Sequence, residues 1–382
     1  MNDRPAYVLL EDGARFDGIA CGAAADAAVG EIVFTTSMSG YQEAMTDPSY
    51  AGQLIAFTFP MVGNYGVSAE AMESDRIHAR AAIMRAAVDS EDAGGRGRFE
   101  RGWLGWLGDC GVPAITDVDT RALVRHIRDR GAMKGGVFDG AVDEAQARSL
   151  IDAEPDMTGR DLAREVTPRE PVILGGSGEG GPRIAMIDTG VKLSIVQNLR
   201  SRGATVELHP CTASPGELRA NDPDAVFLAN GPGDPGALDY IVETVRELIG
   251  GVPVYGICLG HQLLCRAVGL ETYKLPFGHH GANHPVKDLV SGRVEITSQN
   301  HGFAVLGPGG SKTIDGDDAV RWETDFGAAE LTHLNLYDRT VEGLALRDVQ
   351  GATVQYHPEA GPGPHDSLHL FDRFVEEIRE AA

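Results

Sequence analysis

The chain has 382 residues, of which 42% are hydrophobic, and this length favours two cores over one. The formal net charge of −23 at pH 7 argues against non-specific attraction to nucleic acid or to an anionic membrane surface. Five cysteines occur without a CxxC pair, and no apolar run suits a signal peptide or a membrane span. We therefore expect a soluble, cytoplasmic protein of two domains, with neither nucleic acid nor a membrane among its partners.

Short apolar runs separated by glycine-containing turns predict a smaller, β-rich α+β domain at the N-terminus. A polar, turn-rich stretch at 40–50 lies between two of these runs, and by itself it favours a stiff connector over a ligand-binding edge. Residues 69–89 are predicted to be weakly helical and residues 91–97 to form a loop. The predicted strands are 7–10, 30–36 and 53–59.

Two helices are expected later in this domain. Trp103 and Trp106 are three residues apart, which is the spacing of one helix face in a core. Residues 119–131 have a polar cap, apolar residues on one side, late arginines and a final glycine, and this combination predicts a helix.

A Pro-, Gly- and Ser-rich stretch follows and predicts a flexible linker between the two domains. We place the N-terminal domain at 1–165, the linker at 166–182 and the C-terminal domain at 183–382.

The C-terminal domain alternates strand and helix along the chain. Such alternation predicts a mostly parallel, open sheet with helices on both faces, where ligands bind at the carboxyl ends of the strands. The predicted strands are 183–188, 205–208, 224–229, 252–257, 294–297, 344–346 and 352–356, and the predicted helices are 192–203, 238–249, 261–268 and 367–381.

A sharp turn at 256–260, Gly-Ile-Cys-Leu-Gly, joins one of these strands to the helix beyond it. The pattern is typical of a nucleophile elbow, in which a strained backbone exposes one side chain above the sheet. Cys258 would then lie at a helix N-terminus, where unpaired N–H groups and the helix dipole favour the nucleophilic thiolate. The alternative is a small buried cysteine in a structural joint, and the turn pattern alone does not separate the two.

A thiolate nucleophile needs a base and a group that orients the base. His357 ends a predicted strand and Glu359 follows two residues later, so the carboxylate can reach the imidazole and hold its tautomer. Residues 228–235 form a glycine-rich turn after another strand, and its accessible N–H groups suit an oxyanion hole. The same turn could cradle a phosphate, but the G-x-x-x-x-G-K-[ST] pattern is absent from the sequence.

These three motifs, together with Gln-Asn-His-Gly-Phe at 299–303, resemble those of the class I (triad) glutamine amidotransferases. Four further stretches resemble the small, glutamine-hydrolysing subunits of carbamoyl-phosphate synthase, and this resemblance covers almost the whole chain. The triad motifs define only the broad class, so the narrower assignment rests mainly on the N-terminal domain. The four stretches are Phe-Thr-Thr-Ser-Met-Ser-Gly-Tyr-Gln-Glu at 34–43, Thr-Asp-Pro-Ser-Tyr at 46–50, Gly-His-His-Gly-Ala-Asn-His-Pro-Val-Lys at 278–287 and His-Pro-Glu-Ala-Gly-Pro-Gly-Pro-His-Asp at 357–366.

The resemblance implies a role for each site residue. Cys258 would attack the side-chain amide of glutamine, with His357 as the base and Glu359 as its orienting carboxylate. The backbone amides of Gly231 and Leu259 would hold the oxyanion. If Ser49 also contacts the substrate, the turn at 40–50 is a ligand-binding edge after all. The residues that match glutamine-binding positions are Ser49, Gly231, Gly233, Leu259, Gln262, Asn300, Gly302 and Phe303.

The resemblance also implies a partner. Ammonia would pass through an internal tunnel to a large synthetase subunit, which activates bicarbonate with ATP and makes carbamoyl phosphate for arginine and pyrimidine biosynthesis. ATP and Mg²⁺ are expected only in that large subunit, and this chain is expected to hold neither a cofactor nor a metal.

Three features lie outside this scheme. The spacing of His279, His280 and His284 could suit a metal, but hydrogen bonding within a loop is the favoured interpretation. Cys265 on the helix after the elbow is expected to be packed rather than reactive. Thr189 stands where the family commonly has an aromatic residue after the aspartate.

Three rival functions remain open at this point. A glutaminase serving another synthetase, such as that for guanylate or anthranilate, would usually lack a domain like residues 1–160. A scaffold or regulatory subunit with a vestigial site would usually have lost one of Cys258, His357 and Glu359. A free-standing thiol hydrolase or peptidase would not need the additional domain.

Overall fold

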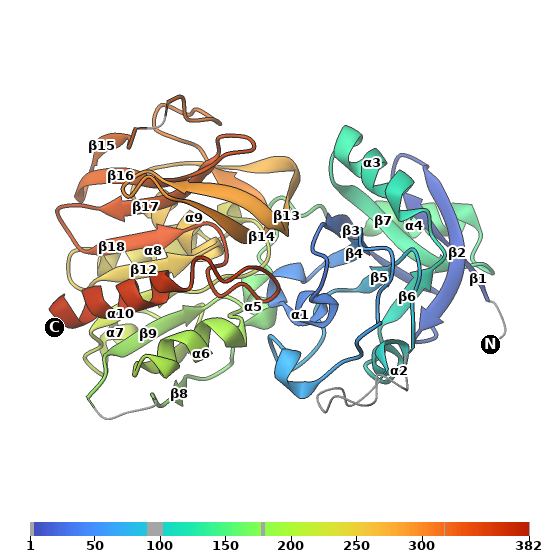
Figure 1. Cartoon of the computed structure of the whole chain (residues 1–382), viewed down its shortest axis with the longest axis horizontal. Helices are drawn as coiled ribbons and strands as arrows, with labels where there is room; N and C mark the ends of the chain where they lie inside the picture. The colour runs from blue at the N-terminus through green and yellow to red at the C-terminus, as the bar shows by residue number, and fades with distance from the viewer. Residues whose placement is uncertain (1–3, 90–101, 177–179, 317, 382) are drawn as a thin grey trace. The chain divides into compact units, whose positions relative to one another are not determined.

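The computed structural model describes residues 4–89, 102–176, 180–316 and 318–381 (Figure 1). The chain divides into two compact units, and each is described by itself. The first unit comprises Met1–Arg160 and Pro276–Gly281, and the second comprises Asp161–Leu275 and Ala282–Ala382. The predicted loop at 91–97 lies outside the described residues.

The strands described in the first unit form a closed barrel, in the order β1-β2-β6-β5-β4-β3-β7 (Figure 1). β1 pairs antiparallel with both β2 and β7, whereas β3, β4, β5 and β6 follow one another in parallel pairs. Parallel neighbouring strands cannot be joined by a tight hairpin. The hairpin signals in the sequence therefore did not predict that these strands close into a barrel. The strands are β1 (Pro5–Leu10), β2 (Arg15–Gly22), β3 (Ala27–Thr35), β4 (Gln53–Phe57), β5 (Ala81–Ile83), β6 (Pro113–Thr116) and β7 (Met133–Asp139).

The helix predicted over 69–89 is wrong. This stretch contains only the single 3₁₀ turn η2 (Ala69–Ala71) and the buried strand β5. A short apolar run cannot distinguish a strand from a helix by its periodicity, and here the pairing with β4 and β6 in the barrel decides for the strand.

The two helices predicted later in this unit are present. Trp103 is fully buried, and its indole N–H donates to the sulfur of Met84 at 3.3 Å. Asp119 caps its helix by accepting the N–H of Ala122 at 3.0 Å. The helical elements of this unit are α1 (Tyr41–Thr46), η1 (Pro48–Tyr50), α2 (Trp103–Asp109), α3 (Thr120–Arg130) and α4 (Glu144–Ala153).

The segment Pro276–Gly281 joins the first unit although it lies within β13 (Thr272–Asp288). The N–H of Ala132 donates to the carbonyl oxygen of Pro276 at 2.7 Å. Phe277 stacks on Phe34 with ring centroids 6.0 Å apart. The sequence pattern did not indicate this return, because it depends on contacts between residues more than 100 positions apart.

The second unit is built on a mixed sheet. Its parallel part runs β10-β9-β11-β12-β18, and the strands of this part alternate with helices along much of the chain. These strands are β9 (Arg183–Asp188), β10 (Thr205–Pro210), β11 (Ala225–Leu228), β12 (Val254–Ile257) and β18 (Gly351–Val354).

The remaining strands make the sheet mixed, so the expectation of a mostly parallel sheet needs correction. β16 pairs antiparallel with β13, β15 and β17, and β17 pairs antiparallel with β18. β13 and β16 were not predicted, because polar residues interrupt their apolar patterns. The additional strands are β8 (Val172–Leu174), β13, β14 (Val294–Val305), β15 (Arg321–Thr324), β16 (Gly327–Asn335) and β17 (Val341–Leu346).

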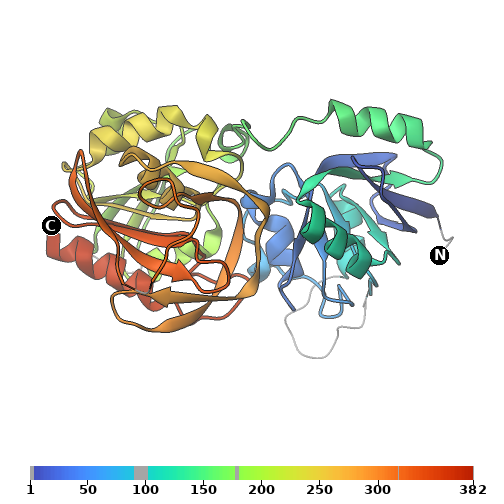
Figure 2. The same cartoon turned by 90° about the horizontal axis from the view of Figure 1, so that it is seen from above.

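Helices cover both faces of the parallel strands, as expected. On one face of the sheet, side chains of α7, α8 and α9 pack with Val226 and Leu228 of β11. On the other face, side chains of α6 and α10 pack with Phe227 of the same strand. Figure 2 shows the red C-terminal helix and the yellow helices on opposite sides of this sheet. Each Leu or Phe buried there contributes about 1.5–3 kcal/mol. The helices are α5 (Ala163–Val166), α6 (Leu193–Ser201), α7 (Pro215–Arg219), α8 (Asp239–Leu248), α9 (Leu259–Ala267) and α10 (His369–Ala381).

Part of the predicted linker at 166–182 is ordered. β8 pairs antiparallel with β10 at the edge of the sheet.

Within the described residues, no helix combines the length and the apolar character needed to cross a bilayer.

Candidate active site

Cys258 lies at the junction of β12 and α9, at the carboxyl edge of the parallel strands. Its backbone has φ 56° and ψ −106°, a conformation that non-glycine residues rarely adopt, and it is 2% exposed. The turn requires glycine at 260, because a Cβ there would lie 2.2 Å from the carbonyl oxygen of Leu228. The structure therefore contains the strained elbow that the motif predicts.

His357 and Glu359 meet at the same edge of the sheet. The N–H of His357 donates to the carbonyl oxygen of Ser298 at 2.9 Å, which fixes the backbone after β18. Nδ1 of His357 lies 2.6 Å from Oε1 of Glu359 and donates to it. A proton held at Nδ1 leaves Nε2 able to accept another. Nε2 is buried and has no hydrogen-bond partner within the part of the chain that the structure describes.

The register of the sheet brings Cys258 and His357 together. β12 and β18 are parallel neighbours, with Ile257 opposite Val354. Both residues therefore leave adjacent strands at the same edge. The thiol of Cys258 donates to the carbonyl oxygen of Asn300 at 3.7 Å. Cys258 is also close enough to His357 to help raise the pKa of the imidazole, so a proton can move between them.

Lys192 is a site residue that the sequence reasoning missed. Its Nζ donates to Oε1 of Glu359 at 3.0 Å and to the carbonyl oxygen of Gly361 at 2.8 Å. Its side chain is 2% exposed, and lysine is almost never buried so deeply without a partner. A lysine in the short turn between the buried strand β9 and α6 was the available signal. The four side chains form the series Cys258, His357, Glu359 and Lys192.

These contacts set the charge states of the base and its partner. Burial alone would raise the pKa of Glu359, but Lys192 and then His357 outweigh it and lower this pKa to about 2. Burial alone would lower the pKa of His357, but Glu359 and then Cys258 raise it to about 10. Glu359 is therefore ionised at neutral pH, and His357 readily holds a proton.

The free energy of unfolding is expected to fall as the pH rises from 6.5 to about 10. Across this range native His357 keeps a proton that the unfolded chain has released, so the stabilisation is complete below pH 6.5 and lost at the upper end. Glu359→Gln removes the carboxylate that retains the proton and should flatten this dependence. Urea unfolding at about pH 6.5, 8 and 9.5 measures both slopes.

The control for this measurement is Glu295→Gln, which removes the negative charge that contacts the half-exposed side chain of His369. This variant should keep the wild-type slope. Equal slopes for the wild type and Glu359→Gln would contradict the expected stabilisation of His357 by Glu359.

Gly231 and Leu259 occupy matching positions on neighbouring strands. Leu228 of β11 is opposite Gly256 of β12, and each of the two candidate oxyanion donors follows three residues later. A Cβ on Gly231 would lie 2.1 Å from the carbonyl oxygen of Thr189 and 3.1 Å from a methyl group of Leu259. Leu259 is the first residue of α9, where the N–H has no partner within the helix. The two N–H groups are thus presented beside the elbow.

The predicted glutamine-binding residues fall into two groups. Those in the second unit lie on α9, in the turn after β11 or on β14. Gln262 donates through Nε2 to the carbonyl oxygen of Phe303 at 2.8 Å and to Oε1 of Gln355 at 3.0 Å. Gly233 has φ 93° in the turn after β11, and a Cβ on Gly302 would meet nothing within 4 Å. Asn300 contacts the thiol as described above.

Ser49 belongs to the first unit. Its N–H donates to Oδ1 of Asp47 at 2.8 Å, in the short turn η1. Its contact with glutamine stays a prediction, as do the binding roles of the other residues.

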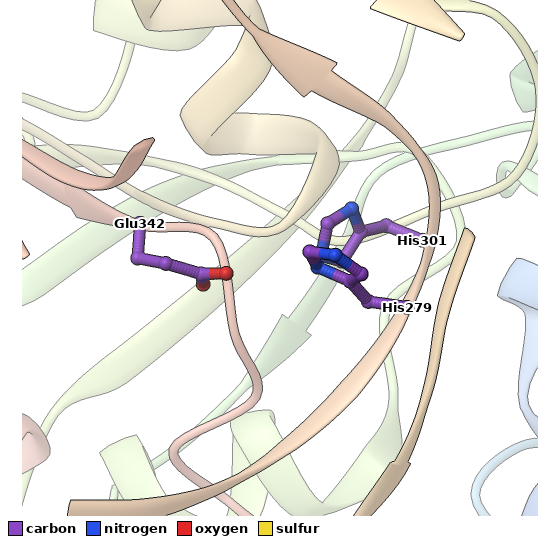
Figure 3. A group of neighbouring side chains, drawn as sticks. All are labelled: His279, His301 and Glu342. Carbon is purple, nitrogen blue, oxygen red and sulfur yellow. The ribbon is translucent and has the colours of Figure 1, made fainter. Parts of the chain in front are cut away.

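A buried polar network extends from this site. Figure 3 shows the side chains of His301 and Glu342. The side chain of Gln299 contacts both of them. Gln299 donates through Nε2 to Oε2 of Glu342 at 2.9 Å, and its Oε1 lies 2.9 Å from Nε2 of His301. Nδ1 of His301 lies 2.7 Å from the carbonyl oxygen of Phe303 and donates to it. These bonds hold the strand that carries Asn300 and Phe303.

The three histidines of the possible metal motif all lie on β13. His279, the third side chain labelled in Figure 3, and His280 belong to the first unit, whereas His284 belongs to the second. His280 stacks on Tyr50, and His284 lies edge-on to Tyr337. Aromatic contacts thus involve two of the three histidines, and the absence of a metal stays a prediction. Cys265 is fully buried on α9, with its sulfur 3.7 Å from Nε2 of His261.

Comparisons with known proteins agree in both units. The family described as "Carbamoyl-phosphate synthase small chain, CPSase domain" matches residues 8–137, and "Glutamine amidotransferase class-I" matches residues 185–377. Each of three relatives is named "Carbamoyl phosphate synthase small chain". That of Chlorobaculum tepidum is 44% identical, covering 98% of each chain. That of Streptomyces coelicolor is 43% identical, covering 97% of this chain and 95% of its own. That of Archaeoglobus fulgidus is 42% identical, covering 98% and 99%.

Proposed function

The chain belongs to the family of carbamoyl phosphate synthase small chains, with a class I glutamine amidotransferase domain, and from this premise we propose the chemistry of its site. It hydrolyses L-glutamine to glutamate and ammonia through a thioester on Cys258. The observation that carries this proposal is the buried series from Cys258 through His357 and Glu359 to Lys192, at the carboxyl edge of parallel strands.

In the first half of the reaction, Cys258 reacts as the thiolate, and Nε2 of the His357 imidazolium holds the proton. The thiolate attacks the side-chain amide carbon of glutamine, and the carbonyl oxygen becomes an oxyanion. The N–H groups of Gly231 and Leu259 stabilise it, and one such donor typically contributes about 10²–10³ in kcat. As the carbon–nitrogen bond breaks, His357 returns its proton to the nitrogen, which leaves as ammonia.

In the second half, water attacks the thioester carbon and gives one proton to Nε2 of His357. The same two N–H groups hold the second oxyanion. The carbon–sulfur bond then breaks, the sulfur leaves as the thiolate beside the His357 imidazolium, and glutamate is released. Glu359 stays ionised throughout, because Lys192 and then His357 outweigh the effect of burial and lower its pKa to about 2.

The ammonia is consumed by a large chain of the same synthase, with bicarbonate and ATP as its other substrates, in arginine and pyrimidine biosynthesis. The family name supports this partner, since a small chain implies a large one. ATP and Mg²⁺ belong to the large chain, and no cofactor of this chain takes part in glutamine hydrolysis. A cytoplasmic location is part of the same proposal and is supported by five unpaired cysteines.

A glutamine analogue whose side chain ends in a diazoketone tests this function. It should alkylate Cys258 and abolish carbamoyl phosphate synthesis from glutamine, because the thiolate attacks the carbon that replaces the amide nitrogen. Synthesis from added ammonia should continue. The measurements are both synthesis rates in the complex of the small and large chains, and peptide mass spectrometry to locate the label. Alkylation elsewhere, or loss of both activities together, would contradict the proposal.

A further inference from the structure

The carboxyl end of β9 lies against the turn that follows β11, and Thr189 makes the contact. Thr189 is 1% exposed, and its hydroxyl lies 2.9 Å from the carbonyl oxygen of Asn230 and 3.2 Å from that of Ala229. A hydroxyl has one proton to donate, so the shorter contact to Asn230 is its principal hydrogen bond. Thr189 thus holds one particular carbonyl group of this turn.

That carbonyl belongs to the same peptide group as the N–H of Gly231. A trans peptide is planar, and its C=O and N–H point in opposite directions. With the Asn230 oxygen held by Thr189, the Gly231 N–H must point away from Thr189. The hydroxyl of Thr189 therefore determines the direction of one candidate oxyanion donor without touching the donor itself.

The need for such a restraint comes from glycine. Gly231 has no Cβ and can adopt backbone conformations closed to other residues, so this peptide group can rotate more easily than its neighbours. Its absence of a side chain is required, because a Cβ would lie 2.1 Å from the carbonyl oxygen of Thr189. Glycine makes the close approach possible, and the Thr189 hydroxyl removes the freedom that glycine brings.

Thr189 is itself held firmly. Oδ1 of Asp188 accepts the N–H groups of Gly190 and Val191, both at 2.8 Å. The N–H of Lys192 donates to Oδ1 of Asn230 at 3.1 Å. Residues 188–192 therefore bind both the side chain and the backbone carbonyl of Asn230. The turn 188–192 therefore supports the oxyanion side of the site through Thr189 and the triad side through Lys192.

We propose that Thr189 is a positioning residue that locks the peptide group between Asn230 and Gly231, and so keeps the Gly231 N–H directed for oxyanion binding. This inference rests on the proposed glutaminase function and adds to it a residue outside the nucleophile, the base and the two donors.

The test compares Thr189→Val, which keeps the shape but removes the hydroxyl, with Thr189→Ser, which keeps the hydroxyl. In the complex with the large chain, Thr189→Val should lower kcat for glutamine hydrolysis by about 10–100-fold, because an oxyanion donor becomes misdirected part of the time. The KM for glutamine should change much less, since the oxyanion forms only after binding. Thr189→Ser should stay close to wild type.

Two further measurements distinguish a directed N–H from general damage. The aldehyde analogue of glutamine adds to Cys258 and places an oxyanion in the same hole, so Thr189→Val should weaken its inhibition by the same factor as kcat/KM. Alkylation of Cys258 by iodoacetamide forms no oxyanion, and its rate should not change. Thr189→Ala serves in the same comparison if the valine variant does not fold.

An unchanged kcat in Thr189→Val would overturn the inference. Parallel losses of kcat and of the alkylation rate would also overturn it, because they would show that Thr189 only maintains the fold. A wild-type complex that forms carbamoyl phosphate from ammonia but not from glutamine would instead refute the proposed function itself.

Discussion

Replacement of Cys258 by serine is expected to lower glutamine-driven carbamoyl phosphate synthesis by at least about 10³-fold. A serine hydroxyl is far less acidic than a thiol, and His357 cannot generate enough alkoxide at neutral pH to replace the thiolate. Synthesis from added ammonia should remain near the wild-type rate, because ammonia bypasses the thioester. Both rates are measured in the complex with the large chain, with glutamate release as a second measure of hydrolysis.

Cys265→Ser is the matched control for this prediction. Cys265 lies on the same helix and is also buried, but its sulfur contacts His261 rather than His357. This variant should retain glutamine-driven synthesis. If Cys258→Ser retained it as well, the thioester mechanism would be wrong, and if Cys258→Ser lost both nitrogen sources equally, Cys258 would be structural.

The second large effect is expected from His357→Asn, which should reduce glutamine hydrolysis by about 10³-fold or more. Asparagine can still accept or donate a hydrogen bond near Glu359, but it cannot carry a proton from the thiol to the leaving nitrogen. Loss of the imidazole also removes the positive charge that favours the thiolate, so iodoacetamide should alkylate Cys258 more slowly at neutral pH. Steady-state hydrolysis and the pH dependence of alkylation measure the two effects.

His369→Asn provides the comparison, because His369 also contacts a carboxylate, through Nε2, but is half-exposed and lies on α10. It should leave both measurements unchanged. Hydrolysis at the wild-type rate in His357→Asn would show that another group is the base.

The main parts of the site could be predicted because each is local in the chain. The strained turn around Cys258 needs only the glycines within two residues of it, and Glu359 reaches His357 from two positions away. The glycine-rich turn at Gly231 likewise follows its own strand. Local steric rules constrain such short motifs wherever the fold places them. The four longer helices of the second unit, α6, α8, α9 and α10, and its parallel strands followed from periodicity for the same reason.

The barrel, the antiparallel strands β13 and β16, and the contacts of Lys192 and Thr189 were decided by tertiary structure alone. Lys192 meets Glu359 across 167 positions of sequence, and Thr189 meets Asn230 across 41. The residues within one strand do not specify which strand lies beside it. That order follows from burial over the whole unit, and it brought the turn after β9 against both the triad and the oxyanion turn. The sequence by itself thus determined which groups react, whereas the packing of distant strands determined how those groups are charged and directed.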